Sequence, residues 1–355
     1  MDKYYSCDRL LTLKDKNGKP PEIFITDGNR TAGKSVSYKK KLISTFLKTK
    51  DVNQFFYLYR NKSDMSNCAD VFFNDIKRIF YPSYSMTEKR ILNGNIVVLY
   101  LNGVECGYCL PLSMSHKFKN MSALFSRVKH GFFDEYQNEN NIYLPNEVEK
   151  LMSLHISIAR GDGEQHRYVP LYMASNTVSI LNPYYSALGI NKMLKKNTKI
   201  LKGDGWVFER TYNENANTAM MESGFVRAFS KSKYSSFASS NVYLNDNESL
   251  IERPSGGNQY LLTVIYNQKP YNIRKYSDVV YVSTGCDETF NNRICFNVND
   301  VVDDRALRVT TGNFIVIMLR EYFNRGMMRF ENLDCKNMTL DLLSYIWYII
   351  NGSTV

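Results

Sequence analysis

One eight-residue segment near the amino terminus constrains the fold more than any other feature of this sequence. Residues 28–35 read GNRTAGKS, which fits the pattern G-x-x-x-x-G-K-[ST] in full. They follow the apolar run PEIFITDG (21–28) and precede the helix-compatible stretch 34–48. A strand, a glycine-containing turn and a helix in this order are the setting of a P-loop. The sequence therefore predicts an α/β fold with this turn at the carboxyl end of a strand.

The residue types in this segment suit a bound polyphosphate. The two glycines let backbone N–H groups turn towards phosphate oxygens, and the helix that follows presents its positive end to the same anion. Lys34 is expected to reach the β- and γ-phosphates, and the Ser35 hydroxyl to ligate Mg²⁺. We therefore predict ATP and Mg²⁺ as ligands. The predicted phosphate-binding residues are Gly28, Asn29, Arg30, Thr31, Ala32, Gly33, Lys34 and Ser35.

A pair of acidic residues supplies the second half of the predicted site. Asp134 and Glu135 follow two phenylalanines near the end of the predicted strand 130–136. Asp134 can hold Mg²⁺, and Glu135 can orient and deprotonate the attacking water. A glutamate in this position is typical of an enzyme that transfers the phosphoryl group to water, whereas a kinase uses another acceptor. We therefore predict an ATPase.

Three further residues are candidates for sensing or stabilising the departing phosphate. Asn176 follows the predicted strand 167–175 and is the candidate γ-phosphate sensor, with a simple Asx turn as the alternative. Arg30 could stabilise the transferred group within its own site. Arg160 ends the predicted helix 145–159 and could act on the nucleotide of a neighbouring subunit. An isolated arginine at a helix end is, however, more often a dipole or solvent partner.

Strand and helix patterns alternate through the first half of the chain. This alternation predicts a mainly parallel sheet with helices on both faces. Together with the P-loop and the Asp134–Glu135 pair, it leads us to predict an ASCE-type P-loop ATPase domain. The predicted strands are 21–28, 54–60, 95–101, 105–113, 130–136 and 167–175, and the predicted helices are 34–48, 69–80 and 145–159.

We predict three regions along the chain. Residues 1–200 form the ATPase domain. Residues 201–258 form a linker or lid region, because 212–258 are rich in Asn, Ser and Gly and weakly periodic. Residues 259–355 form a smaller α/β domain, with strands at 259–267, 278–284 and 293–298 and helices at 311–326 and 339–350.

Charge and composition narrow the class of partner and compartment. The net charge is +10, which favours a polyanion such as nucleic acid. No stretch approaches the roughly 20 apolar residues of a membrane span, and residues 1–13 lack a secretory h-region. The seven cysteines form no disulfide framework, and we interpret the CxxC pair Cys106 and Cys109 as structural. We expect a soluble, cytoplasmic protein with no membrane partner.

The sequence also resembles a known family, the DNA-packaging ATPases of short-tailed phages with protein-primed linear genomes. These are small relatives of the terminase large subunit. The segments that carry the resemblance are 7–11 (CDRLL), 28–35 (GNRTAGKS), 133–136 (FDEY), 143–148 (YLPNEV), 175–184 (SNTVSILNPY), 264–267 (VIYN) and 326–332 (GMMRFEN).

The resemblance implies a homo-oligomeric ring, a pentamer, that drives double-stranded DNA into a procapsid. Partners would include the portal and procapsid, with a packaging RNA as a further candidate. The protein would work in the host cytoplasm, docked transiently on the procapsid and absent from the mature virion. Within the family pattern, Asp134 and Glu135 are the Walker B pair, and Asn176 lies in the coupling segment.

Two positions carried over from the family keep alternatives open. Arg160 is the best match to the trans-acting arginine finger, and Arg167 is the second choice because extra residues at 161–165 blur the alignment. Residues 60–62 correspond to a pore-facing loop, in which Lys62 would touch DNA phosphates. An ordinary surface lysine is the alternative for Lys62.

The second domain resembles an RNase H-like nuclease that has lost its activity. Such a nuclease needs several carboxylates converging on two metal ions, and the strand 259–267 has none. The other acidic residues there form no convincing set; they are Asp278, Asp287, Asp303 and Asp304.

Three alternative functions remain open. The first is a helicase or another nucleic-acid ATPase of the P-loop class. The second is a nucleotide-binding assembly protein without turnover, against which Glu135 argues. The third is a packaging motor whose second domain cuts DNA.

Overall fold

The computed structural model describes most of the chain, and the chain divides into two compact units. The described residues are 5–30, 32–50, 52–138, 142–160, 163–178, 180, 182–195, 198–211, 218, 224, 228, 250–296, 300, 306–309 and 314–352. The first unit comprises residues 1–178 and 199–240, and the second comprises 179–198 and 241–355.

A nine-stranded sheet forms the centre of the first unit, in the order β3-β4-β5-β2-β6-β7-β1-β9-β8. The strands from β5 to β9 in this order are mutually parallel, whereas β3, β4 and β8 add antiparallel pairs at the two edges. The strands are β1 Ile23–Gly28, β2 Gln54–Tyr59, β3 Met86–Ile91, β4 Ile96–Leu101, β5 Val104–Pro111, β6 Val128–Asp134, β7 Leu171–Asn176, β8 Ile200–Lys202 and β9 Trp206–Thr211.

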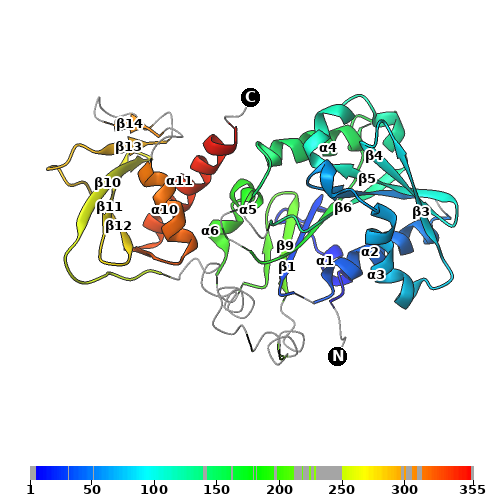
Figure 1. Cartoon of the computed structure of the whole chain (residues 1–355), viewed down its shortest axis with the longest axis horizontal. Coiled ribbons are helices and arrows are strands. Elements are labelled where there is room, and N and C mark those ends of the chain that lie inside the picture. Colours follow the sequence, from blue (N-terminus) through cyan, green and yellow to red (C-terminus); the bar gives the residue numbers. More distant parts are fainter. Residues whose placement is uncertain are drawn as a thin grey trace. The chain divides into compact units, whose positions relative to one another are not determined.

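Helices cover both faces of this sheet (Figure 1). Helices α2 and α3 pack against each other and against the sheet, and α4 packs against two 3₁₀ helices, η2 and η3. Aromatic side chains fill the core under α2 and α3, among them Tyr38, Phe72 and Phe132. The helices are α1 Asp8–Leu11, α2 Lys34–Lys48, α3 Cys68–Phe80 and α4 Glu147–Ala159, with 3₁₀ helices η1 Lys62–Asp64, η2 Leu112–Phe118 and η3 Ser122–Phe125.

The strand order explains how the predicted site is assembled. Strands β6, β7 and β1 are adjacent and parallel, so their carboxyl ends lie at one edge of the sheet. Gly28 pairs with Asn176, and Asp134 pairs with Ala174 in the register of these strands. The P-loop, the acidic pair and Asn176 therefore meet at this edge. The predicted mainly parallel α/β fold is confirmed.

The start of the predicted linker differs from expectation. Residues 201–258 are predicted as a linker, but the segment opens with the end of strand β8 and continues with strand β9, which pairs in parallel with β1 from Trp206 to Thr211. Strand β9 has only six residues and follows a lysine-rich stretch, so its own sequence gives little indication of a strand. Its pairing partner, β1, is remote in sequence. Residues 212–249 lie outside the described part of the chain except for 218, 224 and 228.

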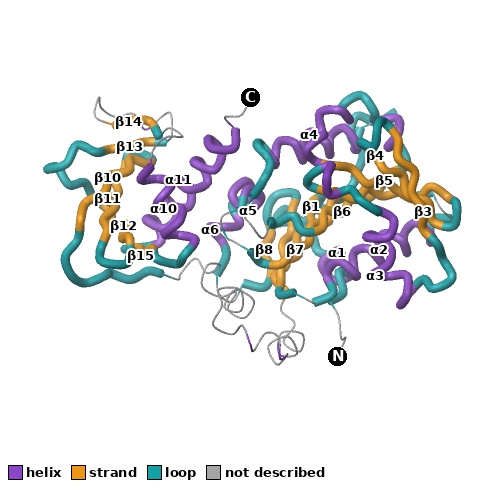
Figure 2. Tube along the Cα trace, in the orientation of Figure 1, coloured by secondary structure: helices purple, strands orange, loops and turns teal. Residues whose placement is uncertain are grey.

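The second unit contains a six-stranded sheet in the order β14-β13-β10-β11-β12-β15 (Figure 2). In chain order its first five strands lie 3-2-1-4-5, with only the second antiparallel to the others, which is the arrangement of an RNase H-like sheet. Helix α11 packs on α10, β12 and β15. The elements are α5 Pro183–Leu188, α6 Ile190–Met193, β10 Gln259–Tyr266, β11 Lys269–Lys275, β12 Val280–Thr284, β13 Arg293–Cys295, β14 Ala306–Arg308, α10 Phe314–Asn324, β15 Met328–Phe330 and α11 Leu333–Gly352.

None of the described helices combines the length and the apolar composition that spanning a bilayer requires.

Candidate functional site

The glycine-rich loop is shaped by two glycines with different roles. A side chain at Gly28 would place its Cβ 2.3 Å from the carbonyl oxygen of Thr211, so only glycine lets β9 lie this close. Gly33 caps α2 with a φ of 89°, in the left-handed region that favours glycine. Asn29 and Ala32 are buried in the loop. Thr31 lies outside the described residues.

Lys34 is buried at the start of α2 and is held over the loop. Its Nζ donates to the carbonyl oxygen of Asn29 at 2.8 Å and to Oδ1 of Asn176 at 3.4 Å. Burial lowers the pKa of Lys34 to about 8, although the negative charges of Asp27 and Asp134 act in the opposite direction. A phosphate bound beside this ammonium would supply the charge that stabilises it.

Ser35 and Asp134 join the loop to the acidic pair. The Ser35 hydroxyl donates to Oδ1 of Asp134 at 2.8 Å, and the Tyr57 hydroxyl donates to Oδ2 at 3.4 Å. Burial raises the pKa of the Asp134 carboxyl, whereas the charge of Lys39 and the Ser35 hydrogen bond lower it. A hydroxyl and a carboxylate side by side are the oxygen ligands that Mg²⁺ prefers. This donor set fits the predicted metal.

Glu135 follows directly and differs from Asp134 in exposure. Its side chain is exposed, and its backbone has a φ of 54°. Few residues other than glycine adopt this region, and such conformations concentrate at functional sites. The geometry turns the chain sharply after Asp134 and leaves the Glu135 carboxylate accessible to a bound substrate and its water.

Arg160 lies away from the glycine-rich loop of its own chain. It follows α4, is exposed, and donates to the carbonyl oxygen of Lys119. The neighbouring Ala159 carbonyl accepts a hydrogen bond from the backbone N–H of Arg167, whose side chain contacts Val128 at the amino end of β6. The loop lies at the carboxyl ends of these strands. The sheet therefore separates Arg160 from its own P-loop.

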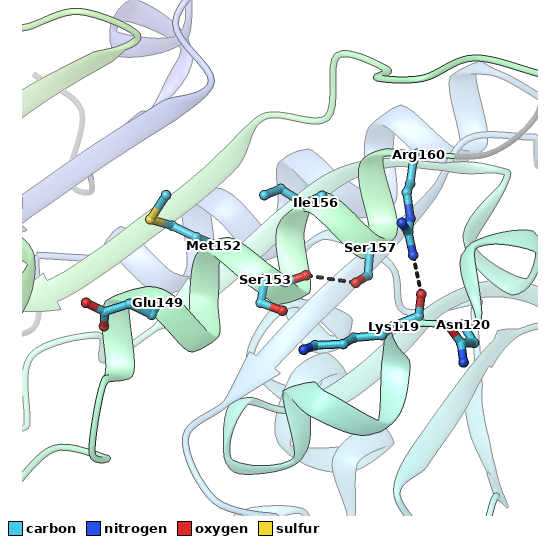
Figure 3. Close-up of a pocket in the computed structure, with 8 residues that line it drawn as sticks. All are labelled: Lys119, Asn120, Glu149, Met152, Ser153, Ile156, Ser157 and Arg160. Carbon is cyan, nitrogen blue, oxygen red and sulfur yellow. Dashed lines mark hydrogen bonds between the residues drawn. The ribbon is translucent and has the colours of Figure 1, made fainter. Parts of the chain in front are cut away.

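A surface pocket of about 530 Å³ lies beside Arg160, between α4 and the end of η2 (Figure 3). Met152 and Ile156 on α4, two turns and one turn before Arg160, are both more than half exposed, at 58% and 52%. The full lining is Lys119, Asn120, Glu149, Met152, Ser153, Ile156, Ser157 and Arg160.

Arg167 is buried, with 5% exposure, and its guanidinium is bound within its own chain. It donates to four carbonyl oxygens, those of Phe125, Ser126, Val128 and Ile158. These bonds tie η3, β6 and α4 together. Of the two finger candidates, this placement favours Arg160.

Arg60, Lys62 and Arg30 have different surroundings. Arg60 forms an ion pair with the fully buried carboxylate of Glu147, with 3.0 Å between Nε and Oε2. Its positive charge is therefore paired within its own chain. Lys62 is exposed and donates to the carbonyl oxygen of Asn93. It therefore remains the candidate for DNA contact. Arg30 is half-buried within the loop itself.

A buried polar cluster around Asp27 is not predicted from the sequence. The Tyr136 hydroxyl and the Gln137 side-chain amide donate to the two carboxylate oxygens of Asp27, each at 2.6 Å. All three side chains are buried. The sequence indicates this cluster only through a polar Tyr-Gln pair that comes directly after Asp134 and Glu135.

The second unit shows no metal site in the part that the structure describes. No group of three or more His, Cys, Asp or Glu residues could hold a metal ion there. Asp287 is paired with Arg274, and Asp278 is exposed in the turn before β12. Asp303 and Asp304 lie outside the described residues.

The chain is similar to known proteins over most of its length. A family model described as podovirus DNA encapsidation protein (Gp16) matches residues 1–346. The DNA packaging protein of Bacillus phage phi29 is 26% identical over 322 residues, which cover 89% of this chain and 91% of the relative. The DNA packaging protein of Bacillus phage B103 is 26% identical over 310 residues, with coverage of 86% and 91%. A chain of the bacteriophage Phi-29 viral genome packaging motor assembly shares the fold, with a TM-score of 0.58 and 21% identity over 97% of this chain and 100% of that chain.

Proposed function

The chain belongs to the podovirus DNA encapsidation protein family, and we propose that it is an ATP-driven motor that moves double-stranded phage DNA into a preformed procapsid. Relatives over most of its length are named DNA packaging proteins. The single observation that supports the enzymatic part is the 2.8 Å hydrogen bond from Ser35 to Asp134, beside the buried Lys34. It joins two segments that each carry one half of an ATPase site.

In the proposed reaction, Lys34 binds the β- and γ-phosphates, and Ser35 and Asp134 hold Mg²⁺. Bound Mg²⁺ would neutralise charge on the phosphate oxygens. Glu135, exposed beside Asp134, orients the attacking water and accepts its proton. Asn176 contacts Lys34 through Oδ1. A change in the position of Lys34 after hydrolysis would therefore be passed to the end of β7.

Arg160 completes the proposed site from a neighbouring subunit. Its position at the opposite edge of its own sheet supports a role across a subunit boundary, because it lies away from its own loop. This arrangement requires a head-to-tail ring, which we propose to be a pentamer docked on the portal of the procapsid in the host cytoplasm. A packaging RNA is a further proposed partner. The second unit is proposed to bind a partner without cutting DNA.

Replacing Glu135 by Gln tests the hydrolytic role directly. The variant removes the base but keeps the volume and polarity of the side chain. We expect ATP affinity within about twofold of wild type, and a turnover number lower by roughly a hundredfold or more. Phosphate release and binding of a fluorescent ATP analogue measure the two quantities. The matched control is Glu321→Gln, at an exposed glutamate of α10 in the second unit. Near-normal turnover by Glu135→Gln would refute this assignment.

Replacing Lys62 by Ala tests the proposed contact with DNA. Each phosphate contact releases counterions, so its loss should reduce the slope of log affinity against log salt by about one. Binding to double-stranded DNA of unrelated sequences should weaken equally. Lys48→Ala, at an exposed lysine near the end of α2, makes the same charge change elsewhere. Identical slopes for the two variants would show that Lys62 is an ordinary surface lysine.

A further inference from the structure

The backbone at Glu135 is held in an unfavourable conformation between two anchored neighbours. Its φ of 54° lies in the left-handed region, which a glutamate does not occupy without support from the surrounding structure. On one side, Asp134 is fixed by Ser35 and Tyr57. On the other side, Tyr136 and Gln137 give further support.

Both of these residues are bound to Asp27, the residue that precedes the glycine-rich loop. Tyr136 is 0% exposed and Gln137 is 2% exposed, so neither gains hydrogen bonds from solvent. Their donors occupy the two carboxylate oxygens of Asp27, each at 2.6 Å, and Asp27 is itself fully buried. Charge-assisted hydrogen bonds of this length are the strong ones. Strand β1 therefore fixes the two residues that follow Glu135.

The same cluster reaches the end of β7. The side-chain oxygen of Gln137 accepts a hydrogen bond from the backbone N–H of Val178 at 3.0 Å, two residues after Asn176. The Tyr136 carbonyl accepts a hydrogen bond from Arg60 at 2.6 Å. The turn at Glu135 is thus connected to three neighbouring strands, whereas the Glu135 carboxylate itself remains exposed.

We propose that Asp27 is a positioning residue for Glu135: by accepting hydrogen bonds from Tyr136 and Gln137, it fixes the left-handed turn that directs the Glu135 carboxylate towards the attacking water. This inference rests on the proposed ATP hydrolysis and adds a residue that acts on the base through the backbone of the turn. Positioning of a base changes the chemical step and leaves ground-state binding of ATP unchanged.

Tyr136→Phe tests the inference because it removes one hydroxyl and keeps the ring in its buried site. We expect kcat for ATP to fall about tenfold, with KM within about twofold of wild type. The control is Tyr108→Phe, at a buried tyrosine of the same unit whose hydroxyl donates to Glu105. We expect both constants to stay within about twofold there. Asp27→Asn, which keeps the shape of the side chain but removes its charge, should lower kcat at least as much as Tyr136→Phe.

A second measurement separates positioning from general loss of structure. In single-turnover experiments, the Tyr136→Phe substitution should lower the rate of ATP hydrolysis about tenfold when it is made in the wild-type protein. It should cause no further loss of rate in the Glu135→Gln variant, because the carboxylate that Tyr136 helps to position is already absent there. An equal loss in both backgrounds, or a raised KM with unchanged kcat, would overturn the positioning role and leave the ATPase assignment standing. Absence of hydrolysis by the wild type would refute the proposed function itself.

Discussion

At Lys34, burial in the fold and binding of a phosphate have opposite effects on the pKa of the side chain. The fold buries its ammonium and lowers its pKa from 10.5 to about 8. Below that pH the buried side chain is mostly charged, and its burial then counts against the folded state of the free protein. A bound triphosphate would reverse the shift, since an adjacent negative charge favours the protonated lysine. Binding at alkaline pH must then take up a proton.

This linkage predicts a pH dependence of ATP affinity. Below about pH 7 Lys34 is almost fully protonated, and the affinity should be nearly constant. As the pH rises through 8, the free protein loses the proton that the complex needs, so ATP should bind roughly tenfold more weakly at pH 9 than at pH 7. Titration calorimetry in two buffers of different ionisation enthalpy would count the protons taken up.

Lys34→Arg is the matched control for this pH profile. Arginine stays protonated throughout the range, so the variant should bind more weakly but with an affinity that does not change between pH 7 and pH 9. Wild-type affinity that is equal at both pH values, without proton uptake, would contradict the lowered pKa of Lys34.

At the scale of an element, the first turn of α4 depends on one buried ion pair. Glu147 begins the helix with a fully buried carboxylate that accepts hydrogen bonds from Arg60 and from the backbone N–H of Leu144, the latter at 2.7 Å. Arg60 in turn donates to the carbonyl oxygen of Tyr136. The pair therefore links the end of β2, the turn after β6 and the start of α4.

Glu147→Ala should destabilise the protein strongly, because it leaves the Arg60 guanidinium buried without its carboxylate. We expect a loss of about 3–5 kcal/mol in the free energy of unfolding, measured by urea unfolding followed by circular dichroism. The control is Glu149→Ala, in the same helical turn but exposed, with an expected change within about 0.5 kcal/mol. Equal losses for the two variants would show that the buried pair contributes little.

The elements that sequence patterns predict are those with a local signal. The glycine-rich turn, the strands before Asp134 and Asn176, and the amphipathic helices all lie where expected, and the parallel sheet then brings Ser35 to Asp134. Strand β11 is not predicted, since Pro270 and three basic residues within 269–275 resemble a loop, although it pairs with both β10 and β12. Helix α11 begins at Leu333 and not at 339.

Side-chain partnerships across the fold have no local signal. Asp27 precedes a glycine and would suit an ordinary turn, but its partners Tyr136 and Gln137 are 109 and 110 residues away in sequence. Arg60 is predicted as part of a DNA-binding loop, whereas its charge is bound to Glu147. Such contacts depend on which strands become neighbours, and this is known only once the sheet order is known.

For the whole molecule, the predicted family is confirmed by a match over residues 1–346. The domain plan changes in detail: β8 and β9 belong to the first unit, and residues 179–198, which include α5 and α6, group with the second. We propose that the ATPase domain extends to the end of β9, at Thr211.

The proposed ring leads to a prediction that can be tested only on assemblies of several subunits. If a site combines Glu135 of one subunit with Arg160 of the next, Glu135→Gln and Arg160→Ala rings are each inactive, but mixed rings contain complete sites. Random assembly of equal amounts should restore about a quarter of the interfaces. The amplitude of single-turnover phosphate release, measured on rings assembled on procapsids, should recover accordingly.

The control mixture combines two variants whose substituted residues, Lys34 and Glu135, lie in the same proposed site of one chain. Lys34 and Glu135 flank the same Ser35–Asp134 contact, so every site in a mixed ring of Lys34→Ala and Glu135→Gln subunits lacks one of the two groups. This mixture should stay inactive, while the Arg160→Ala mixture recovers. Recovery in both mixtures would place Lys34 and Glu135 in different sites, and recovery in neither would remove Arg160 from the neighbouring nucleotide.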